Sequence, residues 1–240
     1  MGIQANITAV ENEIAEAADS VGRNPSEVKL IAVSKTRPAE DVAEALLAGT
    51  FEFGENRVRE LLDKQRDIQD IDRAIDKIPN IRWNLIGHLQ RNKVKSIINK
   101  IALLHSLDSH RLAREIELRA AAEGASMDVL IQVNAGGEAQ KTGIAPDECG
   151  KFLSLVIAEC PHIRVRGLMA VVPFVSDPED VRGLFRQTRA LYDRLKDEYA
   201  GKGADFTELS MGMTGDYKVA VEEGATMVRV GTAIFGERVY

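Results

Sequence analysis

The sequence predicts an α/β fold in which eight parallel strands close into a (β/α)8 TIM barrel. Three observations lead to this prediction. Short apolar or β-branched runs recur eight times along the 240 residues, amphipathic stretches separate them, and no G-x-G-x-x-G follows the first run, as it often does in open doubly wound sheets. Because no Gly/Ser/Pro-rich linker divides the repeats, we expect a single domain over residues 1–240.

Each apolar run is expected to form one strand that is buried on both faces, as parallel strands are. In chain order, the expected strands cover residues 28–36, 51–54, 81–87, 102–107, 128–134, 163–171, 206–211 and 226–234. The stretches between them are expected to be helices over residues 39–48, 55–66, 91–98, 109–123, 146–159, 178–199 and 216–223. Ser109 and Gly124 are typical start and stop signals at the ends of the fourth helix.

Two further segments lie outside the repeat. Residues 3–21 have helical periodicity and precede the first strand, so we expect an extra N-terminal helix packed on the barrel. Residues 66–80 are charged and end in Pro79 and Asn80, which indicates a loose surface excursion. Neither segment is typical of a second domain.

Composition points to small-molecule chemistry. A net charge of −6 offers no basic field to nucleic acid or to an anionic membrane. Cys149 and Cys160 have neither C-x-x-C nor zinc spacing, so we expect two buried thiols in a reduced, cytoplasmic protein. No signal peptide, myristoylation site or membrane-spanning run is visible. The four histidines lack ligand spacing, so no metal is expected.

Two cations are unusually placed for a barrel, whose chemistry lies at the carboxyl ends of its strands. Lys35 ends the first apolar run, where a lysine can form an imine if burial or a neighbouring cation favours its neutral form. Taken alone, a lysine after a strand is typical of a solvated loop residue, and the other features below are what single out Lys35. Arg229 interrupts the last apolar run, and a buried guanidinium needs a partner or a position near the mouth. An outward-facing or salt-bridged arginine is the alternative.

Two turns near the end of the chain have the composition of an anion site. Ser210, Gly212 and Thr214 follow the seventh run and lead into a helix, whereas Gly231 and Thr232 follow the eighth. Barrels commonly hold phosphate with the loops after strands seven and eight and with a helix N-terminus. Combined with an imine-forming lysine and an arginine that can face a ring nitrogen, these turns indicate pyridoxal 5′-phosphate (PLP).

Sequence blocks along nearly the whole chain carry a resemblance to a known family. They are A-V-S-K-T-R-P at 32–38, F-G-E-N at 53–56, W-N-L-I-G-H-L-Q-R-N-K at 83–93, H-S-L-D at 105–108, K-T-G at 141–143, R-G-L-M at 166–169, S-M-G-M-T-G-D at 210–216 and V-R-V-G-T-A-I-F-G at 228–236. The chain resembles the pyridoxal-phosphate homeostasis proteins, single-domain relatives of the N-terminal barrel of alanine racemase. The resemblance implies a fold-type III PLP-binding barrel.

The resemblance also implies roles for individual residues. Lys35 would carry the cofactor as a Schiff base and Arg229 would face the pyridine nitrogen. The remaining implied cofactor contacts are the phosphate-binding Ser210, Gly231 and Thr232, with Gly212 in the same turn, and Asn56 and His88 beside the ring. One loop departs from the family pattern: residues 134–143 contain adjacent glycines where a serine-containing polar loop is expected.

The expected site has no visible second catalytic base, and this favours a carrier over an enzyme. An arginine opposite the pyridine nitrogen disfavours protonation of that nitrogen and weakens the ring as an electron sink. Racemisation also needs acid-base groups on both faces of the α-carbon, and Tyr217, the tyrosine nearest the turns in sequence, is expected to pack in a helix. We therefore expect a protein of intracellular PLP homeostasis that holds and releases the cofactor without robust catalysis.

Two other functions remain open at this point. The first is a PLP-dependent amino-acid racemase. The second is a barrel aldolase for phosphorylated substrates with Lys35 as its imine-forming lysine, although this leaves Arg229 without a role. The expected partners are the small-molecule cofactor and, transiently, apo-enzymes that receive it. A monomer or weak dimer is expected, since the second domain that builds the alanine racemase interface has no counterpart here.

Overall fold

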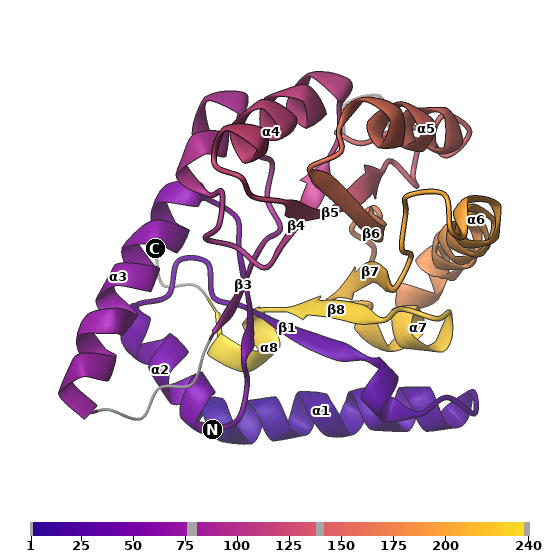
Figure 1. The fold of residues 1–240 in the computed structure, drawn as a ribbon. Helices are drawn as coiled ribbons and strands as arrows, with labels where there is room; N and C mark the ends of the chain where they lie inside the picture. Colours follow the sequence, from indigo (N-terminus) through magenta and orange to yellow (C-terminus); the bar gives the residue numbers. More distant parts are fainter. Residues whose placement is uncertain (1, 76–80, 138–141, 238–240) are drawn as a thin grey trace.

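Eight parallel strands form a closed barrel in the computed structural model, which describes residues 2–75, 81–137 and 142–237. Each strand pairs with its neighbours in sequence, and β1 pairs with β8 to close the barrel (Figure 1). The strands are β1 (Lys29–Val33), β2 (Glu52–Glu55), β3 (Arg82–Leu85), β4 (Leu103–Leu107), β5 (Met127–Val133), β6 (Ile163–Ala170), β7 (Glu208–Met213) and β8 (Met227–Val230). The predicted barrel is confirmed.

Helices surround this barrel on its outer face (Figure 1). The α-helices are α1 (Ile3–Ser20), α2 (Ala39–Leu47), α3 (Val58–Ile75), α4 (His110–Ala122), α5 (Cys149–Glu159), α6 (Arg182–Tyr199), α7 (Tyr217–Glu222) and α8 (Thr232–Phe235). Three short 3-10 helices complete the described elements: η1 (Pro25–Glu27), η2 (Arg91–Ser96) and η3 (Pro178–Val181). Strand and helix alternate in the predicted order.

Three segments differ from the sequence-based expectation. Residues 66–75 continue α3 instead of forming a loose excursion, because Ile68 and Ile71 extend the apolar stripe that begins at Leu61. The rest of that excursion, including Pro79 and Asn80, lies outside the described residues. The expected third helix is the 3-10 helix η2. The last apolar run divides, since β8 ends at Val230 and α8 follows the turn at Gly231.

The interior of the barrel is only partly apolar. Side chains alternate along each strand, so every second residue faces inward. A small apolar cluster occupies this interior, formed by Ile31, Leu103, Leu130, Met169 and Met227, whereas the main core lies between strands and helices. Buried polar side chains occupy further inward positions: Asn84, His105, Ser210 and Arg229. These polar side chains form hydrogen bonds with one another inside the barrel.

The extra helix α1 packs beside the first and last repeats. It contacts α2, α7 and α8 and runs along the lower edge of the molecule in Figure 1. Ile7, Val10 and Ile14 recur at helical spacing and are buried. The amide of Asn6 donates a hydrogen bond to the carbonyl of Ile234 over 2.8 Å, which ties α1 to α8. The predicted N-terminal helix is therefore confirmed.

Other expectations concern membranes, metals and cysteines. No helix within the described ranges is both long and apolar enough to cross a membrane. Those same ranges contain no group of three or more His, Cys, Asp or Glu side chains that could hold a metal ion. Cys149 and Cys160 are buried free thiols, as expected, and burial raises the pKa of the Cys160 thiol to about 11.

Candidate functional site

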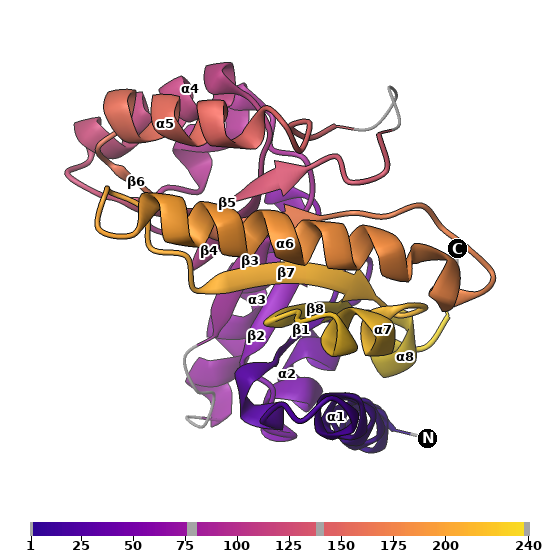
Figure 2. The ribbon, with the colours of Figure 1, turned by 90° about the vertical axis from the view of Figure 1, so that its right-hand side faces the viewer.

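A cavity of about 490 Å³ lies at the carboxyl end of the barrel. Its walls come from residues at or after the ends of β1, β2, β3, β6, β7 and β8. In Figure 2 the arrowhead of β7 points toward the end of the molecule at which α7 and α8 lie. The volume suits a small organic ligand, and the carboxyl end is where barrel proteins place their chemistry.

Five of the eight residues expected at a cofactor site line this one cavity. They are Lys35, Asn56, Arg229, Gly231 and Thr232. Lys35 is partly buried two residues beyond the end of β1, and Asn56 directly follows β2. Because β1 pairs with both β2 and β8, closure of the barrel brings the first, second and last repeats to the same side of the mouth. The structure thus joins residues that are nearly 200 positions apart in the chain.

Arg229 points inward and is 5% exposed. Its Nη1 donates to Ser210 Oγ over 2.7 Å and its Nη2 donates to the carbonyl of Ala170 over 2.9 Å. Both acceptors are neutral, and no carboxylate among the described residues forms an ion pair with this guanidinium. Burial lowers the pKa of Arg229 to about 10, which leaves it cationic at neutral pH. The cavity therefore contains a desolvated positive charge whose described hydrogen-bond partners are neutral, and Asp216 on the cavity wall is the carboxylate that interacts with it.

A chain of hydrogen-bonded, buried side chains leads from Arg229 toward the amino end of the barrel. It consists of Ser210, His105 and Asn84, and we call it the inner relay. Ser210 Oγ and His105 Nδ1 lie 3.0 Å apart, and His105 Nε2 lies 3.2 Å from Asn84 Oδ1. Since Ser210 Oγ accepts from Arg229, its own proton is free to donate to Nδ1, and Nε2–H then donates to Asn84. Burial and the Arg229 charge hold the pKa of His105 well below its ordinary value, as this neutral tautomer requires.

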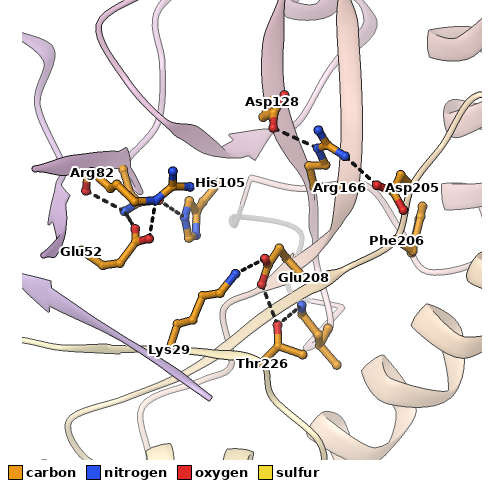
Figure 3. Close-up of polar contacts among 12 residues, drawn as sticks. Lys29, Glu52, Arg82, His105, Asp128, Arg166, Asp205, Phe206, Glu208 and Thr226 are labelled. Carbon is orange, nitrogen blue, oxygen red and sulfur yellow. Dashed lines mark hydrogen bonds and ion pairs between the residues drawn. The ribbon is translucent and has the colours of Figure 1, made fainter. Parts of the chain in front are cut away.

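The inner relay ends at a set of ion pairs at the amino ends of the strands (Figure 3). The Asn84 amide donates to Glu52 Oε2 over 2.9 Å, and Glu52 Oε1 accepts from Arg82 Nε over 2.6 Å. Every polar atom of the relay thus has a partner, and the guanidinium of Arg229 is fixed from the interior of the barrel.

Three expected site residues do not line the cavity. Ser210 is fully buried below it and holds Arg229. Gly212 has φ of +90°, and a Cβ there would lie 2.6 Å from the Ala220 Cβ, so this glycine lets the end of β7 approach α7. The side chain of His88 is 54% exposed, and its Nδ1 lies 3.0 Å from Asp108 Oδ2. These residues shape or flank the site rather than form its wall.

The two turns after β7 and β8 are linked to each other. The Gly231 N–H donates to Thr214 Oγ1 over 3.2 Å, and the Met213 N–H donates to Asp216 Oδ1 over 2.5 Å. Thr214, Gly231 and Thr232 border the cavity beside Arg229. Burial raises the pKa of Asp216, although the hydrogen bond from Met213 and the Arg229 charge oppose this. Small and hydroxyl-bearing residues therefore line this side of the cavity together with the Asp216 carboxylate, which interacts with the Arg229 charge.

Sequence reasoning missed several residues of the site. Arg37 and Phe174 line the cavity, and Phe174 is 97% exposed at the mouth. Arg37 Nη2 donates to the carbonyls of Gly236 and Glu237 and so ties the segment after β1 to the end of the described chain. The arginine directly after Lys35-Thr36 was a usable signal, whereas nothing in the sequence marks Phe174 as a mouth residue.

None of the tyrosines in the described ranges lines the cavity. Tyr217 is buried and its hydroxyl donates to Glu13 on α1, away from the cavity wall. Tyr192 donates to the carbonyl of Phe206 over 2.9 Å, and Tyr199 lies against α5. The predicted packing of Tyr217 is confirmed. Tyr240 lies outside the described residues, as does much of the 134–143 loop, at residues 138–141.

Comparisons with known proteins agree with this architecture. Residues 5–239 match the family model described as alanine racemase, N-terminal domain. The pyridoxal phosphate homeostasis protein of Aquifex aeolicus is 42% identical over 98% of this chain and 97% of its own length. PipY of Synechococcus elongatus, solved with PLP bound, has a TM-score of 0.77 and 35% identity over 93% of this chain and all of that chain.

A more distant likeness concerns the fold alone. An alanine racemase from Clostridium difficile superposes with a TM-score of 0.70 at 15% identity, and the match covers all of this chain but 57% of the racemase. The match therefore leaves a large part of the racemase without a counterpart in this chain. Full-length similarity, the family match and the closed barrel together identify the chain as a member of the pyridoxal phosphate homeostasis protein family.

Proposed function

We propose that this protein binds PLP in the cavity at the carboxyl end of the barrel, holds it covalently through Lys35, and serves as an intracellular carrier and buffer of the cofactor. PLP supplies an aldehyde, which condenses with a primary amine and releases water. The protein's task is to keep this reactive group on one chosen amine and away from others, and to give the cofactor up to recipient apo-enzymes. This role needs no second catalytic domain.

The residues of the cavity fit this ligand. Lys35 supplies a primary amine on the wall, and Arg229 supplies a buried cation that no described carboxylate contacts. An anionic ligand would compensate that charge in a desolvated place, where the attraction is strong. The fully buried position of the guanidinium also suits a hydrogen bond to the ring nitrogen. Thr214, Gly231 and Thr232 offer hydroxyls and close backbone for a phosphate group.

The proposal rests mainly on one observation, which is that the candidate cofactor-binding groups border the same cavity. A lysine after β1, an arginine in β8 and the turns after β7 and β8 all border one space of about 490 Å³. A scaffold protein would have no reason to bury an arginine whose described hydrogen-bond acceptors are both neutral, because that burial costs free energy. The relatives named for PLP homeostasis, and PipY solved with PLP bound, support the same ligand.

The position of Tyr217, the tyrosine nearest the turns in sequence, favours a carrier over a racemase. Tyr217 bonds to Glu13 and does not line the cavity among the described residues. Arg229 opposite the ring nitrogen would keep that nitrogen unprotonated and so limit stabilisation of a substrate carbanion. The curated relatives of Aquifex aeolicus and Escherichia coli are named as homeostasis proteins, not as racemases.

The direct test is Lys35→Ala, with Lys29→Ala as the matched control on the other end of the same strand. Wild type and Lys29→Ala should bind PLP with a shift in visible absorbance, and borohydride should fix the ligand on the peptide that contains Lys35. Lys35→Ala should lose both signals. An unchanged spectrum in Lys35→Ala, or trapping on a different lysine, would refute the assignment. Proton exchange at the α-carbon of amino acids in deuterated water tests the carrier role, which sustained exchange would contradict.

A further inference from the structure

A buried ionic cluster lies next to the cavity, on the side where β2 meets α3. We call it the Lys64 cluster, and it consists of Lys64, Glu55 and Glu60. Lys64 Nζ donates to Glu55 Oε1 over 2.5 Å and to Glu60 Oε1 over 2.9 Å. Lys64 is 5% exposed and Glu55 is fully buried. None of the three lines the cavity.

This cluster holds both neighbours of Lys35 in the chain. Lys64 Nζ also donates to the carbonyl of Ser34 over 2.5 Å, and Ser34 Oγ donates to Glu55 Oε1 over 2.7 Å. On the other side, the N–H of Thr36 donates to Glu60 Oε1. Three contacts therefore fix the peptide immediately before and immediately after Lys35.

The backbone that these contacts hold is an unfavourable one. Thr36 has φ of +66°, a left-handed conformation that is strained for a β-branched residue. Such a conformation persists only where surrounding contacts impose it, and the hydrogen bond from Thr36 to Glu60 is one of them. Together with the contacts at Ser34, it directs the chain through a sharp turn at the carboxyl end of β1, with Lys35 at the cavity wall.

The cluster also costs the fold free energy. Buried ion pairs seldom stabilise a protein more than apolar packing would, because both charges are removed from water. Glu55 Oε2 is buried without a hydrogen-bond partner among the described residues, and burial raises the pKa of Glu55 despite the nearby Lys64. The Lys64 cluster does not favour stability, yet it contacts the residues on both sides of Lys35. A role in positioning Lys35 explains both facts.

We infer that Glu55, Lys64 and Glu60 are positioning residues that fix the peptide around Lys35, so that its amine meets the aldehyde of the bound ligand. The inference rests on the proposed covalent role of Lys35. It also explains why Lys35, rather than Lys64, is the reacting amine, although the two lie close in the fold. Lys64 is saturated by three oxygen acceptors and lies outside the cavity, so no lone pair is available to the ligand.

Glu60→Ala is the most informative variant, because the Glu60 side chain is 23% exposed and its loss should not prevent folding. Glu60→Gln keeps an oxygen that can accept from Thr36, and Asp63→Ala on the same helix removes only exposed ion pairs. Two quantities are compared with wild type. The first is the rate at which PLP forms the borohydride-trapped adduct at Lys35, and the second is the affinity for pyridoxine 5′-phosphate, which has no aldehyde. The second reports the anion site without the covalent bond.

We expect Glu60→Ala to form the trapped adduct about 10-fold more slowly or more, since small displacements of a reacting group have large effects on rate. Binding of pyridoxine 5′-phosphate should stay within about 2-fold of wild type, because the turns after β7 and β8 are untouched. Glu60→Gln should restore most of the rate, and Asp63→Ala should behave as wild type.

The possible outcomes separate this inference from the proposed function. If wild type forms no adduct at Lys35, the proposed function fails. If wild type forms it and Glu60→Ala forms it equally fast, the positioning role is refuted while the function stands. A parallel loss of adduct formation and of pyridoxine 5′-phosphate binding also counts against positioning, since it indicates general damage to the site.

Discussion

The two ends of the barrel treat charge in opposite ways. At the amino ends of the strands, cations and carboxylates pair with one another (Figure 3). These pairs are Lys29 with Glu208, Arg82 with Glu52, and Arg166 with both Asp128 and Asp205. At the carboxyl end, Arg229 is more deeply buried than any of these cations, yet its contacts are a hydroxyl and a carbonyl. Each of these amino-end cations contacts a carboxylate, whereas no carboxylate among the described residues lies within ion-pair distance of Arg229.

From this contrast we infer that the barrel separates the residues that stabilise it from those that bind the proposed ligand. The amino-end pairs lie partly in water, so each contributes little to the free energy of unfolding. The carboxyl end gives up stability by burying Arg229 and, in the neighbouring cluster, Glu55 and Lys64. The inner relay of Ser210, His105 and Asn84 connects the two ends and holds Arg229 in place. Substitutions at the carboxyl end should therefore lower PLP affinity, whereas substitutions at the amino end should leave it unchanged.

The largest effect is expected from Arg229→Met. PLP affinity should fall about 10- to 100-fold, the range for losing a hydrogen bond to a charged group. The free energy of unfolding should fall by about 1–3 kcal/mol, because the buried acceptors on Ser210 and Ala170 lose their donor while the cost of desolvating the cation disappears. Titration with PLP and urea unfolding measure the two quantities.

Arg166→Met is the matched control at the other end of the barrel, where the lost partners are Asp128 and Asp205. It should leave PLP affinity unchanged. Equal loss of PLP affinity in both variants would show that the two ends are not functionally distinct.

The second prediction concerns the inner relay, and its effect is a change in pH dependence. Because the pKa of His105 is lowered in the folded protein, the histidine stays neutral there, while the unfolded chain takes up a proton below about pH 6.5. Stability present above that pH is therefore lost as the pH falls, by up to about 1.4 kcal/mol for each pH unit. His105→Leu should remove this slope between pH 6.5 and 5.

The same variant should also lose about 2–4 kcal/mol at pH 7.5, since Ser210 and Asn84 each keep a buried polar atom without a partner. Urea unfolding at several pH values gives both results. His110→Gln, at the exposed start of α4, is the control for loss of a histidine and should retain the wild-type acid slope. If His105→Leu retains it too, the neutral relay is not the origin of the acid sensitivity.

The sequence allowed the barrel to be predicted because strand burial and helix periodicity are local properties. Lys35 and Arg229 could be singled out for the same reason, since each interrupts or ends an apolar run. Which groups they meet depends on strand register across the barrel. Ser210 is predicted to bind a phosphate. Its hydroxyl lies in the barrel interior because Ser210 pairs with Met227, and the register between β7 and β8 then shifts before Arg229.

The Lys64 cluster shows a signal that sequence reasoning could have used. Leu61, Ile68 and Ile71 form the apolar stripe of α3, and Lys64 falls on that same stripe at helical spacing. A lysine on the buried face of a helix implies a buried carboxylate, and Glu55 ends the preceding strand. Its link to Lys35 could not be foreseen, because it depends on the left-handed turn at Thr36.

The smallest effect is expected from Glu208→Gln at the amino end. Glu208 pairs with Lys29 and accepts from Thr226 Oγ1 over 3.1 Å, but the Lys29 side chain is 45% exposed and can be hydrated when its partner is neutral. The free energy of unfolding should fall by about 0.5–1 kcal/mol, and the loss should shrink at high salt because wild type is then screened as well. PLP affinity should be unchanged. A marked loss of PLP affinity would mean that the amino end contributes to binding through the inner relay. The inference that only the carboxyl end determines PLP affinity would then be wrong.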